Sequence, residues 1–586
     1  MADMQTSRLS ASVLHDESHD QITQHSHTKS RDPGISDKNV DDTSEEHMQD
    51  GVKQAEALTQ SWTKKSLGVA YALMFLLYFI NYFQQSISGS LSPYITSDFE
   101  SHSLLPLVSV ISSVMGAATY MPLAKILNLF DRWVGFALMV VLATLGLIMT
   151  AACNNIGTYF AATVFYSIGF AGMTFAIDVI TLDTSSLRNR GLAYAFTSSP
   201  NIIVAYAGPN VAEKFYAGNW RWAYGAFAII LPVFSAPMVW VLLHAKGQAK
   251  KNGLLPPKIS TDRTFMQSVA NYVTEFDLMG TFLLTAGLVV FLLPFNIHDN
   301  LGNGWGSPGF IAMLVVGVAL LVLFVVWERY MARVPFLPWN IAVSRTVLAA
   351  CMLDVCYDIS YYSWDSYYTS FLQVNCGVSI AVAGYVQNIF DVVSGVWLFA
   401  IGYMIHRTCR YRWLLYWILP LYILGIGLML YFRQPDQKIG YLVMCSIFMA
   451  LSGGALIIVM QVAVLAASDH NNAASALAFL NVFGNIGAAV GGSISSAVWQ
   501  STFPQALAKY LPADVLPDLD TIYEDLATQL SYDKGTAARY AIEISYSVAQ
   551  RNMLIAGTAV MAIAVVCAIV MKDLRLNRDQ TKGVLF

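Results

Sequence analysis

One apolar run of this chain, near residues 346–368, carries three carboxylates at helical spacing. At about 100° per residue, Asp354, Asp358 and Asp365 fall on the same face of a helix, together with Tyr361. An acid inside a bilayer costs about 2.5–3.5 kcal/mol on insertion scales, so it is tolerated where it faces a polar cavity. We predict that this edge lines a solvated central cavity and takes part in moving protons.

A second stripe on the same predicted helix is wholly aromatic and consists of Tyr357, Tyr361, Trp364 and Tyr368. Such rings offer flat apolar area together with hydrogen-bond donors, which suits a bulky ligand of low charge. The positions near mid-membrane hold acids and no Lys or Arg. A phosphate or carboxylate substrate would need a cation there. The stripe therefore favours a nearly neutral ligand.

The composition is that of a membrane protein. Of the 586 residues, 56% are hydrophobic and only 12% are charged, against about 25% charged in soluble domains. A net charge of −4 argues against a nucleic-acid partner. The sequence holds no nucleophile–base constellation, no cluster of metal ligands and no G-x-x-x-x-G-K-[ST] loop. We expect neither an enzyme nor a cofactor or metal site, and we expect an ion gradient to supply the energy.

Fourteen apolar runs are long enough to cross a bilayer. They lie near 67–88, 104–126, 133–153, 157–180, 193–214, 222–243, 276–297, 309–328, 346–368, 378–404, 413–432, 439–466, 474–500 and 552–571. Most of the Lys and Arg between them falls on one side when the N-terminus is placed in the cytoplasm. We therefore predict an all-α membrane protein with both termini inside.

These runs predict six domains, which are named here by residue range. They are a disordered cytoplasmic tail 1–62, a six-helix half 63–243, a cytoplasmic linker 244–275, an inserted two-helix hairpin 276–329, a second six-helix half 346–571 and a cytoplasmic tail 572–586. The second half includes an extracellular loop, 501–551. This loop is long for a connection and carries five tyrosines. Its alternatives are a lid that first contacts the ligand or a folded cap with tyrosines in its core.

Two short motifs resemble transporter signatures in degraded form. Residues 122–132 resemble the major facilitator loop G-x-L-x-D-R-x-G-R-R, but Asn128 replaces the usual acid and Asp131 the usual glycine. Gly208-Pro209 resembles the start of the G-P-x-x-G-G element of antiporters, and the last two glycines are absent. A Gly-Pro step in a membrane helix is alternatively a simple bend.

Longer strings carry a more specific resemblance, and they occur in order on the predicted spans. They are Asp183-Thr-Ser-Ser-Leu-Arg188-Asn-Arg190-Gly, Glu275-Phe-Asp277-Leu-Met-Gly280, Ser360-Tyr-Tyr-Ser-Trp364-Asp365-Ser-Tyr, Phe371-Leu-Gln373-Val374, Ile439-Gly-Tyr-Leu-Val-Met-Cys445 and Ile522-Tyr-Glu-Asp-Leu-Ala-Thr-Gln-Leu-Ser-Tyr532. From about Trp62 to the C-terminus the chain resembles the fungal siderophore iron transporter family, in the fourteen-span branch of the major facilitator superfamily.

The resemblance implies a major facilitator fold with a 6+2+6 arrangement of spans. It also implies a proton-coupled importer of ferric siderophores that works by alternating access as a lipid-embedded monomer, with iron carried only as the siderophore complex. The nearly neutral ligand that the rings favour points to the hydroxamate type. The plasma membrane is the expected location, with endosomal vesicles as the alternative. A drug/proton antiporter of the same fold is the main competing function, and a nutrient sensor without transport is a further one.

In the superfamily layout, spans one, four, nine and twelve line the central cavity, and span ten is their neighbour. We therefore expect substrate contacts from Asn81, Gln84, Gln85, Tyr357, Tyr361, Trp364, Tyr368, Gln387, Asn388 and Gln461. We expect proton coupling from Asp178, Asp354, Asp358 and Asp391, because burial in a low-dielectric medium favours the neutral form of a carboxyl. The alternative for any one of these acids is a hydrogen bond to a tyrosine or to a helix end. Asp365 lies near the outer mouth, where simple solvation is its alternative.

Two further groups of residues have structural interpretations. Asp183, Arg188 and Arg190 follow the fourth run, and we interpret them as a cytoplasmic gate rather than a substrate site. Gly484, Gly487, Gly491 and Gly492 on the thirteenth run favour close helix packing, as do Gly453 and Gly454 on the twelfth.

Overall fold

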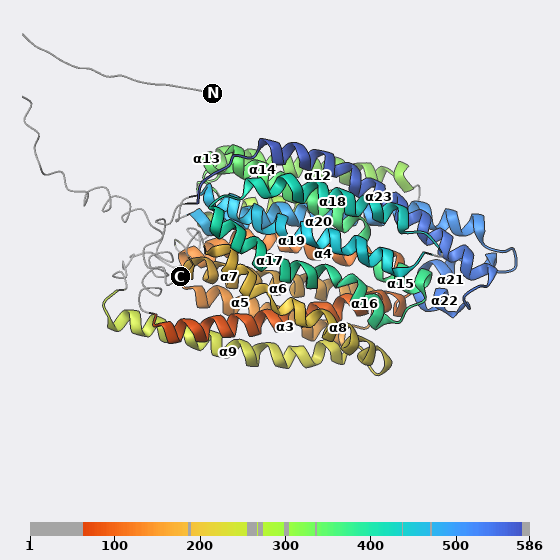
Figure 1. Ribbon diagram of the computed structural model, residues 1–586, viewed down its shortest axis with the longest axis horizontal. Helices are drawn as coiled ribbons and strands as arrows, with labels where there is room; N and C mark the ends of the chain where they lie inside the picture. Colours follow the sequence, from red (N-terminus) through yellow and green to blue (C-terminus); the bar gives the residue numbers. More distant parts are fainter. Residues whose placement is uncertain are drawn as a thin grey trace, which may run out of the picture. The chain divides into compact units, whose positions relative to one another are not determined.

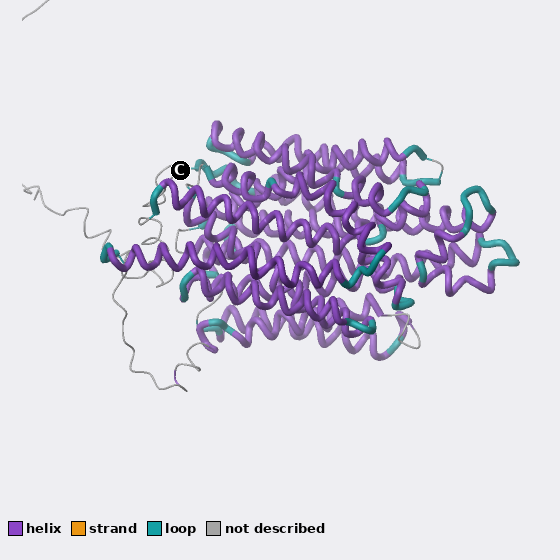
Figure 2. The backbone as a smooth tube through the Cα atoms, turned by 90° about the horizontal axis from the view of Figure 1, so that it is seen from below, coloured by secondary structure: helices purple, strands orange, loops and turns teal. Residues whose placement is uncertain are grey.

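The structure is a computed structural model that describes residues 62–576, apart from 186–188, 255–266, 268–272, 298–303, 334–336, 436 and 469–471. The predicted tail 1–62 therefore lies outside the described residues except for Trp62, as do most of the linker 244–275 and the last part of the tail 572–586. All regular structure among the described residues is helical, as Figure 2 shows. This confirms the all-α prediction for that part of the chain.

The N-terminal half is a run of long helices. They are α3 (Lys64–Asp98), α4 (Leu105–Leu129), α5 (Arg132–Ala152), α6 (Ile156–Thr184), α7 (Arg190–Ser198), α8 (Pro200–Ala217) and α9 (Trp222–Lys251). The helix predicted near 193–214 is interrupted at Ser199, since Pro200 occupies the first position of α8, where a missing N–H is tolerated. α9 extends into the residues predicted as linker.

The inserted hairpin consists of α11 (Leu278–Ile297) and α12 (Pro308–Val326), which continues into a π-helical turn, Trp327–Met331. α11 packs on α4 of the first half and on α20 of the second, so the hairpin lies at the seam between the halves. At one end, Nε1 of Trp327 donates to Asp277 at 2.7 Å, which ties the two helices together. The outward side of α12 exposes apolar residues such as Ile311 and Val315, as a lipid-facing helix would.

The C-terminal half begins with a short helix, α13 (Trp339–Ala342). It continues with α14 (Arg345–Asp365), α15 (Tyr368–Cys376), α16 (Ile380–Gln387), α17 (Ile389–Thr408), α18 (Arg412–Phe432), α19 (Ile439–Ala466), α20 (Ala473–Tyr510) and α23 (Ala537–Val570). Between α20 and α23 the chain forms a 3₁₀ turn, Leu516–Asp518, and the short helices α21 (Leu519–Glu524) and α22 (Leu526–Ser531). We call residues 511–536 the outer cap; Figure 1 shows α21 and α22 beyond the end of the helix bundle.

Twelve described helices are long and apolar enough to cross a membrane, with α16 and α17 forming one of them. Two predicted spans, 193–214 and 346–368, do not meet that test. The first is split into α7 and α8, and the second, α14, carries three acids. Both nevertheless lie alongside the other helices of the bundle (Figure 1).

The halves meet along two seams. In one, α4 and α14 both pack on α20; in the other, α8 packs on α16 and α7 on α17. A Cβ on Gly487 would lie 2.7 Å from the carbonyl oxygen of Val355, and one on Gly454 would lie 2.6 Å from the Cβ of Ser394. These glycines permit the close helix approach that the sequence predicted for them. For orientation, the end with the outer cap is called outer and the end with Arg132 and Lys246 inner.

Candidate functional site

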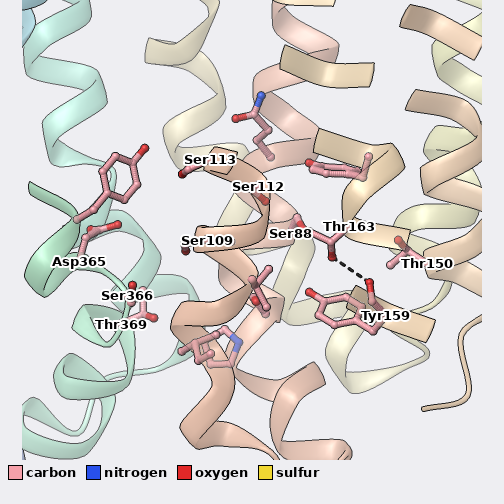
Figure 3. Close-up of a pocket in the computed structure, with 18 of the residues that line it drawn as sticks. Ser88, Ser109, Ser112, Ser113, Thr150, Tyr159, Thr163, Asp365, Ser366 and Thr369 are labelled. Carbon is pink, nitrogen blue, oxygen red and sulfur yellow. Dashed lines mark hydrogen bonds between the residues drawn. The ribbon is translucent and has the colours of Figure 1, made fainter. Parts of the chain in front are cut away.

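A cavity of about 350 Å³ lies toward the outer end between the two halves, and we call it the outer cavity. Its walls come from α3, α4, α5, α6 and α9 on one side and from α14, α15 and Gln387 on the other. Hydroxyl groups dominate these walls, and the following residues contribute them: Ser88, Ser92, Ser109, Ser112, Ser113, Thr150, Tyr159, Thr163, Tyr166, Tyr224, Tyr362, Ser366 and Thr369. In Figure 3, the α4 serines lie between Asp365 on one side and Tyr159 on the other.

Two more cavities continue from the outer one toward the inner end. The middle cavity, about 220 Å³, is lined by Tyr82, Gln85, Ser86, Gly89, Ser90, Asn201, Gln387, Asn388 and Asp391. The inner cavity, about 340 Å³, is lined by residues that include Tyr78, Tyr82, Tyr120, Asp178, Asn201, Asp391, Gln461 and Asn481.

The three cavities share wall residues and so follow one another through the bundle. Gln85, Gly89 and Gln387 line both the outer and the middle cavity, whereas Tyr82, Asn201 and Asp391 line both the middle and the inner one. Gln85 is exposed although it lies in the middle of a membrane helix. The described part of the chain thus contains a polar series of cavities at the contact between the halves.

Each cavity of the series carries a carboxyl group. Asp365 lies in the outer cavity, where Nε2 of Gln387 donates to it at 3.3 Å. Asp391 borders the middle and inner cavities and is hydrogen-bonded by Asn201. Asp178 lines the inner cavity and accepts a 2.5 Å hydrogen bond from the hydroxyl of Tyr78. No Lys, Arg or His is among the described residues that line the three cavities.

Asp354 and Asp358 line none of these three cavities, so the expectation that their edge faces a solvated cavity stays a prediction for these two acids. A Cβ on Gly484 of α20 would lie 2.6 Å from Oδ2 of Asp354 and 2.9 Å from Oδ2 of Asp358. Neither carboxyl lines the outer, middle or inner cavity. Of the three acids on that edge, only Asp365 does so, because the face bearing the other two packs on the glycine row of α20.

The aromatic stripe lies on α14 except for Tyr368, which begins α15, and it is mostly packed against the protein itself. The ring of Tyr357 lies 5.3 Å from that of Tyr422. The other three stripe residues, Tyr361, Trp364 and Tyr368, line none of the three cavities and border a void of about 10 Å³ beside Asp365. Trp364 and Tyr368 are buried. In this conformation the stripe is therefore a wall behind the cavities rather than an open ligand surface.

A buried cation occupies part of that wall. The guanidinium of Arg433, which is 1% exposed, lies 4.5 Å from the ring centre of Trp364 and 4.3 Å from that of Tyr368. Its Nη1 donates to Gln550 at 2.5 Å. Arg433 directly follows the predicted span 413–432, and the structure places it at the end of α18 against rings of α14 and α15.

The polar residues predicted on the first and twelfth spans divide into two groups. Gln85 and Gln461 line cavities. Asn81 and Gln84 do not; Nδ2 of Asn81 donates to Thr174 at 2.6 Å, and Gln84 accepts from the hydroxyl of Tyr166. These two amides join α3 to α6 within the N-terminal half.

Ion pairs gather at the inner end, where the gate was predicted. Nε of Arg132 lies 2.8 Å from Oδ2 of Asp183, and Lys246 forms an ion pair with Asp131. Arg190 is buried and donates to the carbonyl of Ser185 at 3.5 Å. Arg188, the third predicted gate residue, lies outside the described residues. The degraded loop motif therefore supplies both Asp131 and Arg132 to a charge network that joins α5, α6 and α9.

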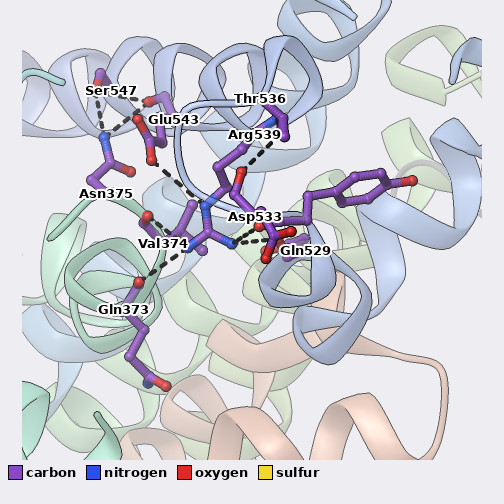
Figure 4. Close-up of polar contacts among 10 residues, drawn as sticks. Gln373, Val374, Asn375, Gln529, Asp533, Thr536, Arg539, Glu543 and Ser547 are labelled. Atoms are coloured by element: carbon purple, nitrogen blue, oxygen red, sulfur yellow. Dashed lines mark hydrogen bonds and ion pairs between the residues drawn. The ribbon is translucent and has the colours of Figure 1, made fainter. Parts of the chain in front are cut away.

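The outer cap is a packed structure, which favours the folded alternative for this loop. Arg539 is 3% exposed and donates to the carbonyl oxygens of Gln529 at 2.6 Å and Val374 at 2.9 Å (Figure 4). Tyr546 is fully buried and donates to Gln529 at 2.7 Å.

The outer cap also reaches the N-terminal half. The backbone N–H of Ser103 donates to Glu524 at 3.0 Å, and that of Leu526 donates to Oγ of Ser97 at 3.2 Å. Nearby, the hydroxyl of Tyr94 donates to Gln373 between α3 and α15. These contacts hold the two halves together at the outer end in this conformation.

The hydroxyl-rich wall of the outer cavity is what sequence reasoning missed. Ser109, Ser112 and Ser113 lie on one side of α4, and Ser88 and Ser92 are one turn apart on α3. That spacing was a usable signal. Serine is also common in membrane helices for packing, so the spacing by itself did not distinguish a cavity wall from a helix contact.

Comparison with known proteins identifies relatives of the whole bundle. The model of a family described as Major Facilitator Superfamily matches residues 74–364. MFS siderochrome iron transporter D of Aspergillus fumigatus is 60% identical over 541 residues, which cover 92% of this chain and 90% of that protein. Siderophore iron transporter mirB of Emericella nidulans is 47% identical over 559 residues, covering 95% of this chain and 92% of that protein.

A solved structure gives the same architecture at low identity. The crystal structure of a bacterial homologue of the human lysosomal transporter Spinster, in an inward-facing and occupied conformation, matches with a TM-score of 0.54 and 12% identity. The match covers 87% of this chain and 97% of that one. At that identity the similarity shows the fold alone.

Proposed function

Because this chain belongs to the fungal siderophore iron transporters of the major facilitator superfamily, we propose that it imports ferric siderophores by proton-coupled alternating access. The observation that carries the proposal is the series of three cavities at the contact between the halves. It combines hydroxyl and amide groups with carboxyls and extends from the outer part of the bundle toward the inner end.

The walls support a ligand of the hydroxamate type. A ferric trishydroxamate is bulky and nearly neutral and presents carbonyl oxygens, which hydroxyl and amide donors can bind. The outer cavity supplies such donors from Ser109, Ser112 and Gln85. A ferric tris-catecholate is negatively charged, and the described walls of the series offer carboxyls and no cation to receive it.

The acids along the series support proton coupling. Asp391 and Asp178 border the middle and inner cavities, where a proton can reach them from the same compartment as the ligand. Asp354 and Asp358 are proposed to contribute from the contact between α14 and α20, where a change of charge would bear on helix packing. In a symporter, proton binding from outside and release inside accompany each ligand.

We also propose fourteen spans with both termini in the cytoplasm of a plasma-membrane carrier. Besides the twelve apolar helices, α7 with α8 and α14 would cross, since the acids of α14 face the contact with α20 or the outer cavity. Terminal epitope tags that become accessible to antibodies only after the cells are permeabilised would support the orientation. Fluorescence microscopy of the tagged chain distinguishes the plasma membrane from vesicles.

Uptake of radiolabelled iron tests the function. The protein is expressed in cells that lack their own siderophore carriers, and iron is supplied as ferrichrome, a neutral trishydroxamate, or as a ferric tris-catecholate. We expect accumulation of the first complex, greater at acidic external pH and abolished by a protonophore. Export of unmetallated compounds without iron accumulation would instead support the drug/proton antiporter.

A further inference from the structure

The Gly208-Pro209 step of α8 leaves one backbone carbonyl without its normal partner. In a helix, the carbonyl of residue 205 accepts from the N–H of residue 209, and proline has no N–H. Ala205 is 2% exposed, so its carbonyl has little access to solvent. A buried carbonyl is normally satisfied by some other donor.

That donor comes from the opposite half of the molecule. Nδ2 of Asn388 lies 3.0 Å from the carbonyl oxygen of Ala205 and 3.1 Å from Oγ of Ser86 on α3. Both N–H groups of this one side-chain amide, which belongs to the C-terminal half, thus donate to helices of the N-terminal half.

The surrounding glycines bring these helices together. A Cβ on Gly208 would lie 2.6 Å from the Cβ of Ser86, and one on Gly384 would lie 2.6 Å from the Cβ of Pro209. There is no room for a methyl group at either position. α3, α8 and α16 therefore meet at one point, with Asn388 at its edge.

Asn388 also lies at the break between α16 and α17, beside two cavity residues. Gln387 borders the outer and middle cavities and donates to Asp365. Asp391 borders the middle and inner cavities. A change at either residue, by ligand contact or protonation, acts on the segment that holds Asn388 in place.

We propose that Asn388 is an interdomain latch whose two hydrogen bonds, to the Ala205 carbonyl freed by Pro209 and to Ser86, keep the halves closed at this depth, and that the latch must open for the outer cavity to face outward. It is a positioning residue. The latch rests on the proposed alternating access. Its test needs no siderophore, so the latch and the proposed siderophore transport can fail separately.

The test measures access to the outer cavity. A cysteine replaces Ser92, which lines that cavity, and intact cells are treated with a membrane-impermeant thiol reagent; the chain without this cysteine gives the background from native thiols. Asn388→Ala should raise the initial labelling rate about threefold to tenfold, the shift that one or two ordinary hydrogen bonds give to a two-state equilibrium.

Asn375→Ala is the matched control. The amide of Asn375 also makes two hydrogen bonds, both at 3.0 Å, but its partners Glu543 and Ser547 lie in the same half. Labelling should stay near the parent rate in this variant. An unchanged rate in Asn388→Ala, or an equal rise in both variants, would overturn the latch.

Pro209→Ala provides a second, independent measurement. It restores a backbone N–H that can reach the Ala205 carbonyl within α8. In this background Asn388→Ala should raise labelling by a clearly smaller factor than in the parent, because one of the two latch bonds has been replaced. If Asn388→Ala raised the labelling rate by the same factor in the parent and in Pro209→Ala, the hydrogen bond to the Ala205 carbonyl would not be what keeps the halves closed.

Discussion

The hydroxyl of Tyr78 donates a 2.5 Å hydrogen bond to Oδ1 of Asp178 and thereby joins α3 to α6 at the wall of the inner cavity. A hydrogen bond to an ionised carboxylate is stronger than one to a neutral group. The contact between the two helices therefore depends on whether Asp178 carries a proton. This is the kind of link by which a proton can change the packing of cavity-lining helices.

Asp178→Asn should separate binding from accumulation. The amide keeps the size of the side chain and an oxygen for Tyr78, but it cannot take up and release a proton. We expect accumulation of ferrichrome iron against a gradient to fall by at least about tenfold, while binding to the purified protein changes little. Tyr78→Phe, which removes the hydrogen bond but leaves the titratable carboxyl in place, should lower accumulation less than Asp178→Asn does. Full accumulation in Asp178→Asn would remove this acid from the coupling path.

Gly484→Ala should destabilise the protein where α14 meets α20. The added methyl group would lie 2.6 Å from Oδ2 of Asp354 and 2.9 Å from Oδ2 of Asp358. Overpacking of this kind costs about 1–3 kcal/mol. The measurement is the thermal unfolding midpoint of the detergent-solubilised protein, which should fall.

The matched control for that variant is Gly427→Ala on α18. A Cβ at Gly427 would meet no atom within 4 Å, and alanine is favoured over glycine in helices by about 0.5–1 kcal/mol. This variant should leave the midpoint unchanged or raise it. A midpoint lowered equally by both substitutions would contradict the close approach of α20 to the two carboxyls.

The contact between α14 and α20 shows what can be predicted from the sequence and what cannot. Helical spacing correctly placed Asp354, Asp358 and Asp365 on one face of α14, and the glycine row correctly indicated close packing on α20. Spacing alone does not say which neighbour a face meets. The acids of α14 and the glycines of α20 belong to the same contact. Only the structure shows this, because it places the two helices side by side.

Other outcomes have equally physical reasons. Twelve of the fourteen predicted crossings correspond to described helices that are long and apolar enough to span a membrane, because hydropathy responds to the bilayer rather than to detailed packing. The burial of Arg433 and the hydroxyl wall of the outer cavity depend on contacts between residues far apart in the chain. The sequence also did not predict which amide faces a cavity: Gln85 does, whereas its neighbour Gln84 accepts a hydrogen bond from Tyr166.

Arg433→Gln should lower stability more than the loss of a surface charge would. Its guanidinium is buried and lies 4.5 Å from the ring centre of Trp364 and 4.3 Å from that of Tyr368. A desolvated cation–π contact contributes about 2 kcal/mol or more. Because the planar guanidinium stacks on rings as an ammonium cannot, Arg433→Lys should also be destabilising. Thermal unfolding in detergent measures both variants.

Lys509→Gln is the control for that comparison. Its ammonium lies 5.0 Å from the ring centre of Tyr510, and both side chains are exposed. A solvated contact of this type contributes about 0.5–1 kcal/mol. The midpoint should therefore fall clearly less than in Arg433→Gln. Equal effects would mean that burial does not strengthen the Arg433 contact.

Arg539→Met should release the outer cap. Arg539 holds the cap to α15 through the carbonyls of Gln529 and Val374, and its Nε lies 3.6 Å from Glu543. Methionine keeps much of the side-chain length without the charge, so the ion pair with the buried Glu543 and the hydrogen bonds to both carbonyl oxygens are lost, which is destabilising. We expect a protease added outside intact cells to cleave within residues 511–536 at least about tenfold faster than in the parent, with the rest of the chain intact.

Arg551→Met distinguishes this effect from a general loss of positive charge on α23. Arg551 lies on the same helix and is exposed, so the variant should show the parent cleavage rate. Cleavage of the outer cap at the parent rate in Arg539→Met would mean that contacts such as Ser103 to Glu524 and Leu526 to Ser97 hold it without the arginine. Faster cleavage in Arg539→Met alone would identify Arg539 as the residue that fastens the cap, because the two variants lose the same charge but Arg539 is the one that is buried and bonded to Gln529 and Val374.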